Sequence, residues 1–539
     1  MTKAQVINCE NPANGESIGS SPLHEQKDLD AMMARARQAQ IQWSKLPIKE
    51  RARYMKRVRE YLVKNIDHIA QVISQDNGKT LMDAMATEVV PSTMAISYYI
   101  KNSPKFLKDK WIKPGNILFA NKSSKITRTP FGVVGIISPW NYPFAIPFSE
   151  VVMAILAGNA VILKVATETQ MVGLEIKKAF EYAKMPEGVF NFINIPGRVA
   201  GDAFLECGID KLFFTGSVPI GKKLMAKAAQ TLTPVSLELG GNDPMLVCDD
   251  ANLRRAAAGA LWGGFQNAGQ SCGGVERIYV HKNVYDAFLE ELKNQMHQLR
   301  IGKTDSFDTD IGSMTTSRQK DAVNRHVDDA LSKGARIYAS VEIGKGLTGS
   351  YLPARVLVDV NHDMDVMREE TFGPVLGVMK VNSMEEAIAL ANDSDLGLTA
   401  SVWSKDRKRA EHIARQVKAG ALVINDHLMT HGLAETPWGG FKESGIGRTH
   451  GEIGFAEMTE PQVVVHDYLA MEKNLWWYPF SETTYKGVRG VSQFLYGTSI
   501  GERASGLVCL MRVFFRIFEK PQHARKNHLE TTNDKVTAS

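Results

Sequence analysis

The sequence predicts an α/β protein with two α/β domains in series, and three observations support this fold class. The chain has 539 residues, more than one compact core usually holds. Between Phe131 and Val247, short β-rich runs such as "GVVGIIS" and "KLFFTGS" alternate with helical stretches. The same alternation resumes from about Ala251 to Ile424. It is typical of βαβ units, which build parallel sheets.

The regions before and after these domains have different patterns. From Leu29 to about Gln75, apolar residues recur at helical spacing among Lys, Arg and Glu, which indicates amphipathic helices ahead of the first strand. After residue 467 the chain carries "NLWWYPF" and then a helix-like apolar stretch at 507–518. The last residues, "KNHLETTNDKVTAS", have the composition of a disordered tail.

Composition excludes several classes of function. The 64 Lys and Arg against 59 Asp and Glu give a formal charge of +5, too weak to indicate a nucleic-acid partner. The five cysteines are far apart and odd in number, which favours free thiols, and no Cys/His spacing of a metal site occurs. The N-terminus lacks an apolar signal segment, and the run "VVMAILAGNAVILKV" is too short to span a bilayer. We therefore expect a cytoplasmic protein.

A glycine-containing turn between a strand and a helix is the first candidate site. The dinucleotide fingerprint G-x-G-x-x-G is absent, but in "FFTGSVPIG" a strand runs into Gly216 and Gly221 and then into a helix. Such a turn lets a phosphate approach the backbone, and the helix N-terminus favours an anion. The alternative is a turn with a purely structural role.

Three further stretches carry residues suited to acyl chemistry. Glu238 leaves an apolar strand at a glycine pair and could be a general base, or only a capping carboxylate. Cys272 lies in "QNAGQSCGG", where a glycine-rich backbone can present N–H groups to an oxyanion, although a lone cysteine is more often an inert buried residue. Asn141 in "SPWNYPF" offers an amide donor, or belongs to a surface turn. Glu370 and Phe372 could hold a ribose and a planar ring.

Taken together, these segments resemble the aldehyde dehydrogenase superfamily. The matching segments lie between about Pro130 and Val465 and are "SPWNYP", "AGNAVILK", "FTGSVPIG", "LELGGNDP", "NAGQSC", "EETFGPV" and "PWGGFKESGIGR". The resemblance implies a Rossmann-like cofactor domain, a second α/β catalytic domain and a small β oligomerisation arm. The corresponding boundaries are 1–110 and 132–240 for NAD(P) binding, 241–435 for catalysis, 111–131 and 450–467 for the oligomerisation strands, and 468–539 for a C-terminal extension.

The resemblance also implies residue roles. Cys272 is expected to be the nucleophile, Glu238 the general base, and Asn141 with the backbone N–H of Cys272 the oxyanion hole. NAD or NADP is the implied cofactor, and no metal is implied. The expected cofactor-binding residues are Ser138, Trp140, Lys164, Thr167, Gly216, Ser217, Gly221, Leu239, Glu370 and Phe372.

The implied reaction oxidises an aldehyde to a carboxylic acid through a cysteine thiohemiacetal and a thioester. One alternative is a CoA-acylating dehydrogenase, in which CoA takes the acyl group and a base for water, such as Glu238, is unnecessary. Another is a catalytically silent scaffold with the same fold; the presence of Cys272, Glu238 and Asn141 argues against it.

Two departures from the family pattern bear on specificity. The family often has a glutamate three residues after Lys164 that repels a 2′-phosphate; Thr167 stands there, with Glu168 shifted by one, so we expect NADP to be accepted. Members that act on semialdehydes ending in a carboxylate have an arginine at the position of Ser149. We therefore expect an uncharged aliphatic, including long-chain, or aromatic aldehyde.

The C-terminal extension is a third departure. At 507–518 it predicts a basic amphipathic helix, which could lie on a membrane surface through residues 504–520 or pack on its own or a neighbouring subunit. The apolar face is predicted to hold Leu507, Leu510, Met511, Phe514, Phe515 and Phe518, opposite Arg512 and Arg516. By family resemblance the two strand segments pair between subunits, so a homodimer or homotetramer is expected.

Overall fold

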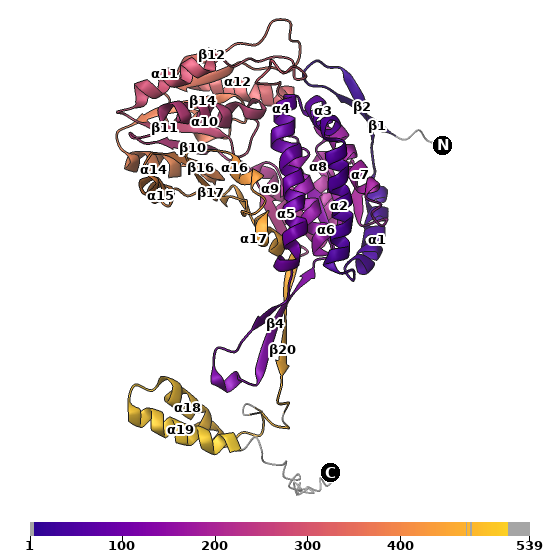
Figure 1. Cartoon of the computed structure of the whole chain (residues 1–539), viewed down its shortest axis with the longest axis vertical. Coiled ribbons are helices and arrows are strands. Elements are labelled where there is room, and N and C mark those ends of the chain that lie inside the picture. Colours follow the sequence, from indigo (N-terminus) through magenta and orange to yellow (C-terminus); the bar gives the residue numbers. More distant parts are fainter. Residues whose placement is uncertain (1–4, 471, 475–476, 516–539) are drawn as a thin grey trace, which may run out of the picture. The chain divides into compact units, whose positions relative to one another are not determined.

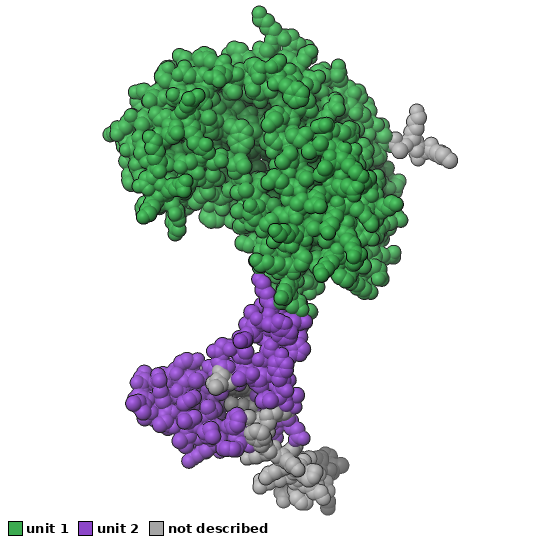
Figure 2. Space-filling model, viewed as in Figure 1, with its two compact units in different colours: residues 1–109, 127–462 green, residues 110–126, 463–539 purple. Residues whose placement is uncertain are grey.

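A computed structural model describes residues 5–470, 472–474 and 477–515 of the chain. The described residues form two compact units, coloured separately in Figure 2. Unit 1 comprises Met1–Asp109 and Thr127–Gln462, and unit 2 comprises Lys110–Ile126 and Val463–Ser539.

Unit 1 contains two large sheets, each flanked by helices (Figure 1). The first sheet has the strand order β19-β9-β8-β5-β6-β7 and is parallel apart from β19, which pairs antiparallel with β9. Its strands are β5 (Val133–Ile137), β6 (Ala160–Lys164), β7 (Phe190–Phe192), β8 (Lys211–Thr215), β9 (Val235–Glu238) and β19 (Gly445–Ile446).

Helices pack on both faces of this first sheet. Because successive strand residues point to opposite faces, Val134 and Ile136 join a core with one set of helices, while Val133 and Ile137 join a second core. One face is covered by α2 (Ile48–Lys64), α3 (Ile66–Asn77), α5 (Val90–Phe106), α6 (Ala145–Ala157) and α7 (Gln170–Tyr182); the other by α1 (Gln26–Trp43), α8 (Gly197–Glu206) and α9 (Val218–Ala228).

The second sheet has the order β12-β13-β14-β11-β10-β16-β17 and is parallel except for the β12–β13 pair. Its strands are β10 (Asp243–Val247), β11 (Val275–His281), β12 (Arg336–Val341), β13 (Ala354–Val358), β14 (Val375–Val381), β16 (Thr399–Trp403) and β17 (Ala421–Ile424). The helices around it are α10 (Leu253–Phe265), α11 (Tyr285–Met296), α12 (Ser317–Ser332), α13 (Asp365–Arg368), α14 (Met384–Asn392) and α15 (Arg407–Ala414).

Short elements complete unit 1. They are β1 (Val6–Glu10), β2 (Ser17–Pro22), α4 (Leu81–Ala84), the π-helical turn η1 (Met85–Val89), η3 (Thr167–Thr169), η4 (Gln266–Gly269), β15 (Leu396–Gly397), α16 (Met429–Gly432), β18 (Phe441–Lys442) and α17 (Gly451–Glu457). The two α/β sheets confirm the fold class that the alternating pattern predicts.

Unit 2 consists of strand segments and a helical hairpin. The strand segments belong to the sheet β20-β4-β3, formed by β3 (Lys110–Ile112), β4 (Lys122–Pro130) and β20 (Thr459–Asp467), with the 3₁₀ turn η2 (Ile117–Phe119) between the first two. Residues 127–130 of β4 and 459–462 of β20 are part of unit 1. The hairpin consists of α18 (Glu482–Tyr496) and α19 (Ile500–Phe514). No helix in the described part of the chain is long and apolar enough to span a bilayer.

The last helix begins earlier than its apolar pattern suggests. Helix α19 starts at Ile500, because Ser499 accepts a hydrogen bond from the backbone N–H of Glu502 and forms a capping box with it. Gly487 and Gly506 let the two helices approach closely: a Cβ at Gly487 would lie 2.0 Å from Val513. Leu507, Met511, Phe514 and Phe515 of the predicted apolar face are exposed, and Phe518 and Arg516 lie outside the described residues.

Candidate active site

The carboxyl edge of the first sheet gathers four of the motif segments. In the parallel register Ile137 pairs with both Lys164 and Phe214, and Thr215 pairs with Glu238, so these strands end at the same level. The residues that follow, Ser138 to Asn141 and Gly216 to Ser217, therefore leave the sheet side by side. Ligands of open α/β sheets bind at this edge.

The loop that carries Cys272 has a strained backbone. Helix α10 ends in the turn η4, where Asn267 and Ala268 adopt φ of 55° and 52°, a region that residues with a side chain rarely occupy. A Cβ at Gly241 would lie 2.2 Å from the carbonyl oxygen of Cys272, so only glycine allows this close approach. On the other side, His427 Nε2 lies 3.0 Å from the carbonyl oxygen of Gly273. Neighbouring segments therefore fix the backbone on both sides of the sulfur.

Two clefts meet at Cys272 and share the residues Thr215, Glu238 and Leu239. The polar cleft is lined by Pro139, Trp140, Asn141, Gly216, Ser217, Gly240, Arg318, Gln319, Glu370 and Phe372 in addition to the shared residues. The apolar cleft is lined on its other walls by Ala86, Thr87, Pro91, Tyr142, Ile146, Ser149, Glu150, Trp262, Gln266, Ser271, Gly273, Leu398, Leu428, Met429, His431, Gly432, Trp438, Thr449 and His450.

The clefts bring together most of the residues that the sequence predicts for the site. Cys272, Glu238, Asn141, Trp140, Gly216, Ser217, Leu239, Glu370 and Phe372 all line the polar cleft. Four predicted cofactor residues do not: Ser138, Lys164, Thr167 and Gly221. Lys164 lies close by, since the backbone N–H of Ser138 donates to its carbonyl at 3.0 Å and a Cβ at Gly197 would lie 3.5 Å from its ammonium.

The helix that follows the Gly216 turn packs tightly on the site. Ser217 is the N-cap residue of α9 and its side chain makes no capping bond. The backbone N–H of Gly216 donates to the carbonyl of Glu238 at 3.0 Å. A Cβ at Gly221 would lie 2.7 Å from Leu239, so Gly221 allows the helix to contact Leu239. The N-terminus of α9 is thereby held at the polar cleft, where its partial positive charge favours an anion.

Trp140 and Phe372 form an aromatic wall of the polar cleft. Their rings meet edge to face with centroids 5.5 Å apart and an interplanar angle of 83°. Glu276 fixes the segment of Phe372, accepting from the backbone N–H groups of Phe372 at 2.8 Å and Thr371 at 3.1 Å. Glu370 accepts from the backbone N–H of Gly241 at 3.0 Å. Sequence reasoning missed Glu276, although a carboxylate inside the buried strand β11 is a signal that a buried partner exists.

Ionisable groups near the sulfur are shifted towards their neutral forms. Burial raises the pKa of the Cys272 thiol, and the carboxyl groups of Glu370, Asp243 and Glu238 raise it further. Burial likewise raises the pKa of Glu238 well above its ordinary value, and the neighbouring Glu150 adds to this shift. The two carboxylate oxygens of Glu238 have no hydrogen-bond partner among the described residues. Glu238 is therefore a poorly solvated carboxyl that gains a proton readily.

Glu150 is a second buried carboxyl at the apolar cleft. It lies on α6 and is 3% exposed, and burial raises its pKa to about 8. One of its oxygens has no hydrogen-bond partner in the described chain. The two histidines of the same cleft are neutral, because burial lowers the pKa of His431 to about 4 and lowers that of His450 well below its ordinary value.

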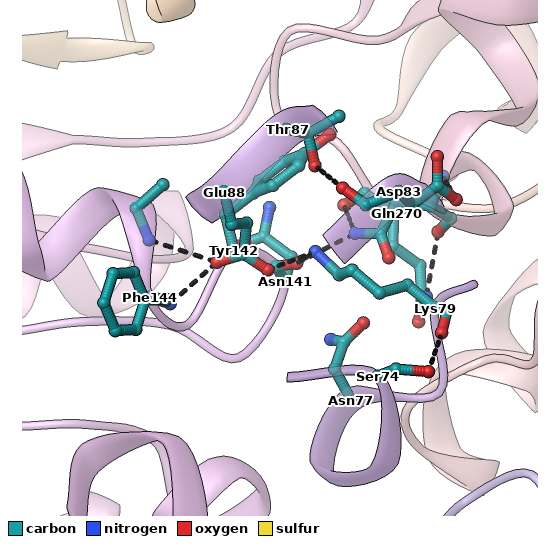
Figure 3. Close-up of polar contacts among 12 residues, drawn as sticks. Ser74, Asn77, Lys79, Asp83, Thr87, Glu88, Asn141, Tyr142, Phe144 and Gln270 are labelled. Carbon is teal, nitrogen blue, oxygen red and sulfur yellow. Dashed lines mark hydrogen bonds and ion pairs between the residues drawn. The ribbon is translucent and has the colours of Figure 1, made fainter. Parts of the chain in front are cut away.

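The end of α3 and the residues just after it hydrogen-bond to the backbone around Asn141; Figure 3 shows the contact made by Lys79. Asn77 Nδ2 donates to the carbonyl of Trp140 at 2.7 Å, and Lys79 Nζ donates to the carbonyl of Asn141 at 2.9 Å. Asn267 Nδ2 donates to the same carbonyl at 2.9 Å, which ties this loop to the loop of Cys272. None of these three residues was predicted from the sequence, since each acts on backbone atoms far away in the chain.

Comparison with known proteins decides the family. A sequence model described as the aldehyde dehydrogenase family matches residues 1–464. The chain belongs to the aldehyde dehydrogenase family. It is thus an oxidoreductase, and the resemblance seen in its motifs is confirmed.

Relatives cover nearly the whole chain. A protein of Methylomonas sp named 4,4′-diapolycopene aldehyde oxidase is 38% identical over 486 residues, which cover 90% of each protein. A putative succinate-semialdehyde dehydrogenase [NADP(+)] of Mycolicibacterium smegmatis is 37% identical over 451 residues, covering 84% of this chain and 86% of that protein.

Solved structures share the fold. A NAD-dependent aldehyde dehydrogenase from Sinorhizobium meliloti gives a TM-score of 0.83 at 32% identity, covering 88% of this chain and 93% of that one. An NAD⁺ complex of an aldehyde dehydrogenase from Bacillus cereus gives a TM-score of 0.81 at 30% identity, covering 86% and 93%. The aldehyde dehydrogenase fold predicted from the motifs is confirmed.

Proposed function

We propose that this aldehyde dehydrogenase oxidises an uncharged aldehyde to its carboxylic acid with NAD(P)⁺, using Cys272 as nucleophile. The observation that carries the proposal is the position of Cys272 at the meeting point of the two clefts, with Asn141 and Glu238 also on their walls. An aldehyde in the apolar cleft and a nicotinamide in the polar cleft would both reach the sulfur.

Cys272 starts the reaction from the neutral thiol. Because its pKa is raised, a base must remove the proton, and Glu238 is an adjacent buried carboxyl without a hydrogen-bond partner in the described chain. The sulfur then adds to the aldehyde carbon, and the oxyanion accepts hydrogen bonds from the Asn141 amide and the backbone N–H of Cys272. When bound, the nicotinamide cofactor supplies the hydride acceptor.

Glu238 also serves the second half of the reaction. Loss of hydride leaves a thioester on Cys272, and Glu238 first releases the thiol proton to solvent. Water then attacks the thioester, Glu238 accepts the proton of that water, and the carboxylic acid leaves with the sulfur of Cys272 set free. This role favours hydrolysis over the alternative in which CoA takes the acyl group. The buried Glu238 also argues against a silent scaffold, because an unpaired buried carboxyl destabilises a fold that has no use for it.

The apolar cleft favours an uncharged aldehyde. Among the described residues that line it, none is Lys or Arg, so an anionic tail would find no cation to pair with. Ser149, which stands where members acting on semialdehydes with a carboxylate have an arginine, lies on the wall of this cleft. Aliphatic and aromatic side chains form much of the rest: Pro91, Ile146, Trp262, Leu398, Leu428, Met429 and Trp438. A long-chain or aromatic aldehyde fits these walls.

NADP acceptance is part of the proposal. Thr167 stands at the start of η3, so the carboxylate of position 167 is missing; Glu168 beside it is exposed to solvent, and its charge opposes the burial that lowers the pKa of Lys164. The exposed Arg318 on the wall of the polar cleft adds a cation there. The residues at this cleft fit a dinucleotide: a helix N-terminus for phosphate, Glu370 for a ribose and Trp140 with Phe372 for a ring.

Assembly through the strands of unit 2 is likewise proposed. Both β3 and most of β20 are exposed in the described chain, and Trp111, Val463 and Val465 are more than half exposed. A homodimer or homotetramer would cover these side chains. The exposed apolar face of α19 would be covered either by a membrane surface or by a neighbouring subunit. Truncation after Asp467 distinguishes these two alternatives. If the truncated protein no longer binds lipid vesicles that the full chain binds, the membrane is supported; if vesicle binding does not change, the neighbouring subunit is supported.

Turnover with a panel of aldehydes tests the function. Decanal, benzaldehyde and succinic semialdehyde are each offered with NAD⁺ and with NADP⁺, and formation of reduced nicotinamide is followed. We expect higher kcat/KM for the two uncharged aldehydes and no turnover with Cys272→Ala. Preference for succinic semialdehyde would overturn the substrate class. Absence of turnover with every aldehyde would support the silent scaffold, and turnover that needs CoA would support the acylating alternative.

A further inference from the structure

A buried ion pair lies beneath the loop of Asn141. Lys79 Nζ and Glu88 Oε1 are 2.6 Å apart, and both side chains are fully buried. Buried ion pairs seldom stabilise a protein more than apolar residues of the same size would, because both charges lose their hydration. Stability alone therefore does not explain this pair, and its other contacts indicate a different role.

Both partners direct their remaining hydrogen bonds to the backbone of residues 141–145, as Figure 3 shows. Lys79 Nζ donates to the carbonyl of Asn141 at 2.9 Å. The second oxygen of Glu88 accepts from the backbone N–H groups of Phe144 at 2.7 Å and Ala145 at 3.1 Å. The Lys79 ammonium also lies 4.4 Å from the ring centroid of Tyr142. The pair thus binds the loop at both of its ends.

These bonds meet a requirement of the loop. Phe144 is the N-cap residue of α6 and supplies no side-chain cap, so the first N–H groups of this buried helix need an acceptor from elsewhere. Glu88 provides it from η1, a π-helical turn between α4 and α5. Such turns are rare and often occur beside functional sites, where they redirect a side chain.

The carbonyl of Asn141 joins three segments. Lys79 and Asn267 both donate to it, and Asn267 belongs to the strained turn before Cys272. The backbone N–H of Asn267 in turn donates to Asp83 at 3.2 Å, four residues after Lys79. The two loops that face each other across the clefts are therefore anchored on the same short stretch of chain.

We propose that Lys79 and Glu88 are positioning residues that set the Asn141 amide against Cys272 for oxyanion stabilisation. Neither side chain is among the described residues that line either cleft, so the pair touches neither substrate nor cofactor and acts through the backbone of the Asn141 loop. The inference rests on the proposed role of Asn141. A displacement of about 1 Å at such a donor costs roughly 100-fold in rate.

The first test is a double variant, Lys79→Met with Glu88→Gln, which removes both charges together and leaves none unpaired. We expect kcat/KM for decanal or benzaldehyde to fall roughly 10- to 100-fold. Alkylation of Cys272 by iodoacetamide, which forms no oxyanion, is expected to change less than about twofold. The control is Lys64→Met with Glu60→Gln, an exposed pair with the same 2.6 Å separation, which should retain full activity.

A double-mutant cycle with Asn141→Ala separates a role through Asn141 from general destabilisation of the fold. It compares the loss of kcat/KM that Asn141→Ala causes in the wild type and in the double variant. If the pair acts through Asn141, Asn141→Ala costs far less in the double variant than in the wild type. Equal costs in the two backgrounds, or a kcat/KM within about twofold of wild type, would overturn the proposal.

Glu88→Gln alone keeps the proposal testable if the double variant does not fold. Its amide oxygen still accepts one hydrogen bond, so a smaller loss, again non-additive with Asn141→Ala, is expected. Hydrogen exchange of the peptide spanning 141–148 provides a measurement independent of turnover and should speed up in this variant. Unchanged exchange would contradict the anchoring. A wild type without aldehyde turnover but with faster exchange in the variant would refute the proposed function while leaving the anchoring supported.

Discussion

The two clefts that meet at Cys272 differ in chemistry and in how the chain builds them. The polar cleft is formed by strand ends, a helix N-terminus and the segment of Glu370, so short contiguous motifs carry it. The apolar cleft is assembled from side chains on separate elements, including Pro91 on α5, Ile146 on α6 and Trp262 on α10. Backbone-based recognition of a dinucleotide leaves a sequence motif, whereas an apolar pocket needs only suitable volumes and leaves none.

The residues that the two clefts share include the one sulfur that both clefts reach, that of Cys272. Glu238 and Cys272 border each cleft, and burial disfavours the charge on each of them. A site that disfavours charge suits an apolar aldehyde, and the ionised fraction of Glu238 starts the reaction by taking the proton of the thiol. Substitutions at the shared residues should impair the reaction with every aldehyde and cofactor, whereas substitutions on one side should impair only the ligand of that side.

Glu238→Gln should have the largest effect. We expect kcat to fall roughly 10²- to 10⁴-fold, because an amide cannot accept the proton of water. Because the Cys272 thiol also loses its base, thioester formation should slow as well, so stopped-flow measurements should show no burst of reduced nicotinamide. Glu443→Gln, a change on the surface pair with Lys222, serves as control. Wild-type turnover in Glu238→Gln would refute its role as base.

The pH dependence of kcat follows from the raised pKa of Glu238. Its ionised form is the base, so the rate falls as pH drops through this pKa, approaching tenfold per pH unit below it. The midpoint should lie well above 4.5, the ordinary carboxyl value, because burial and Glu150 disfavour the charge. A rate profile that stays flat down to ordinary carboxyl values would contradict this environment for the base.

Trp262→Ala should affect the apolar cleft alone. Trp262 is 43% exposed, so its loss should not unfold the protein. We expect kcat/KM for decanal or benzaldehyde to fall about tenfold, with little change for acetaldehyde and none in the KM of the cofactor. Leu232→Ala, at a site that is 86% exposed, is the matched control. An equal loss for acetaldehyde would remove Trp262 from the substrate wall.

Thr167→Glu should affect the polar side alone, and by the smallest amount. A carboxylate at this position would repel the 2′-phosphate, so kcat/KM with NADP⁺ should fall roughly fivefold while that with NAD⁺ is unchanged. Steady-state kinetics with both cofactors measure the ratio. Wild-type preference for NAD⁺ by tenfold or more would already refute the prediction that Thr167 admits NADP.

The candidate site could be predicted from the sequence where it depends on contiguous residues. Cys272, Glu238 and Asn141 stand in glycine-rich or proline-rich turns that follow strands or helices, and the parallel register then places them at adjoining edges. The helix of 507–518 was predicted with the wrong start, because the cap at Ser499 precedes its apolar pattern.

The glycine directly after Cys272 serves packing. A Cβ at Gly273 would lie 3.0 Å from Trp438 and 3.2 Å from Thr399. Protein side chains already fill that space, so Gly273 permits tight packing. The apolar cleft opens instead between Trp438 and the residues of α5, α6 and α10.

The sequence by itself determined the two α/β domains, the family and the residues suited to the chemistry, because strand alternation and turn motifs are local properties of the chain. Only the tertiary structure decided what holds those residues in place. Lys79, Glu88, Asn267 and Glu276 bind backbone atoms of segments that are distant in sequence, and no local pattern encodes such a contact. Burial, which sets the protonation of Cys272 and Glu238, likewise arises only when the segments pack together.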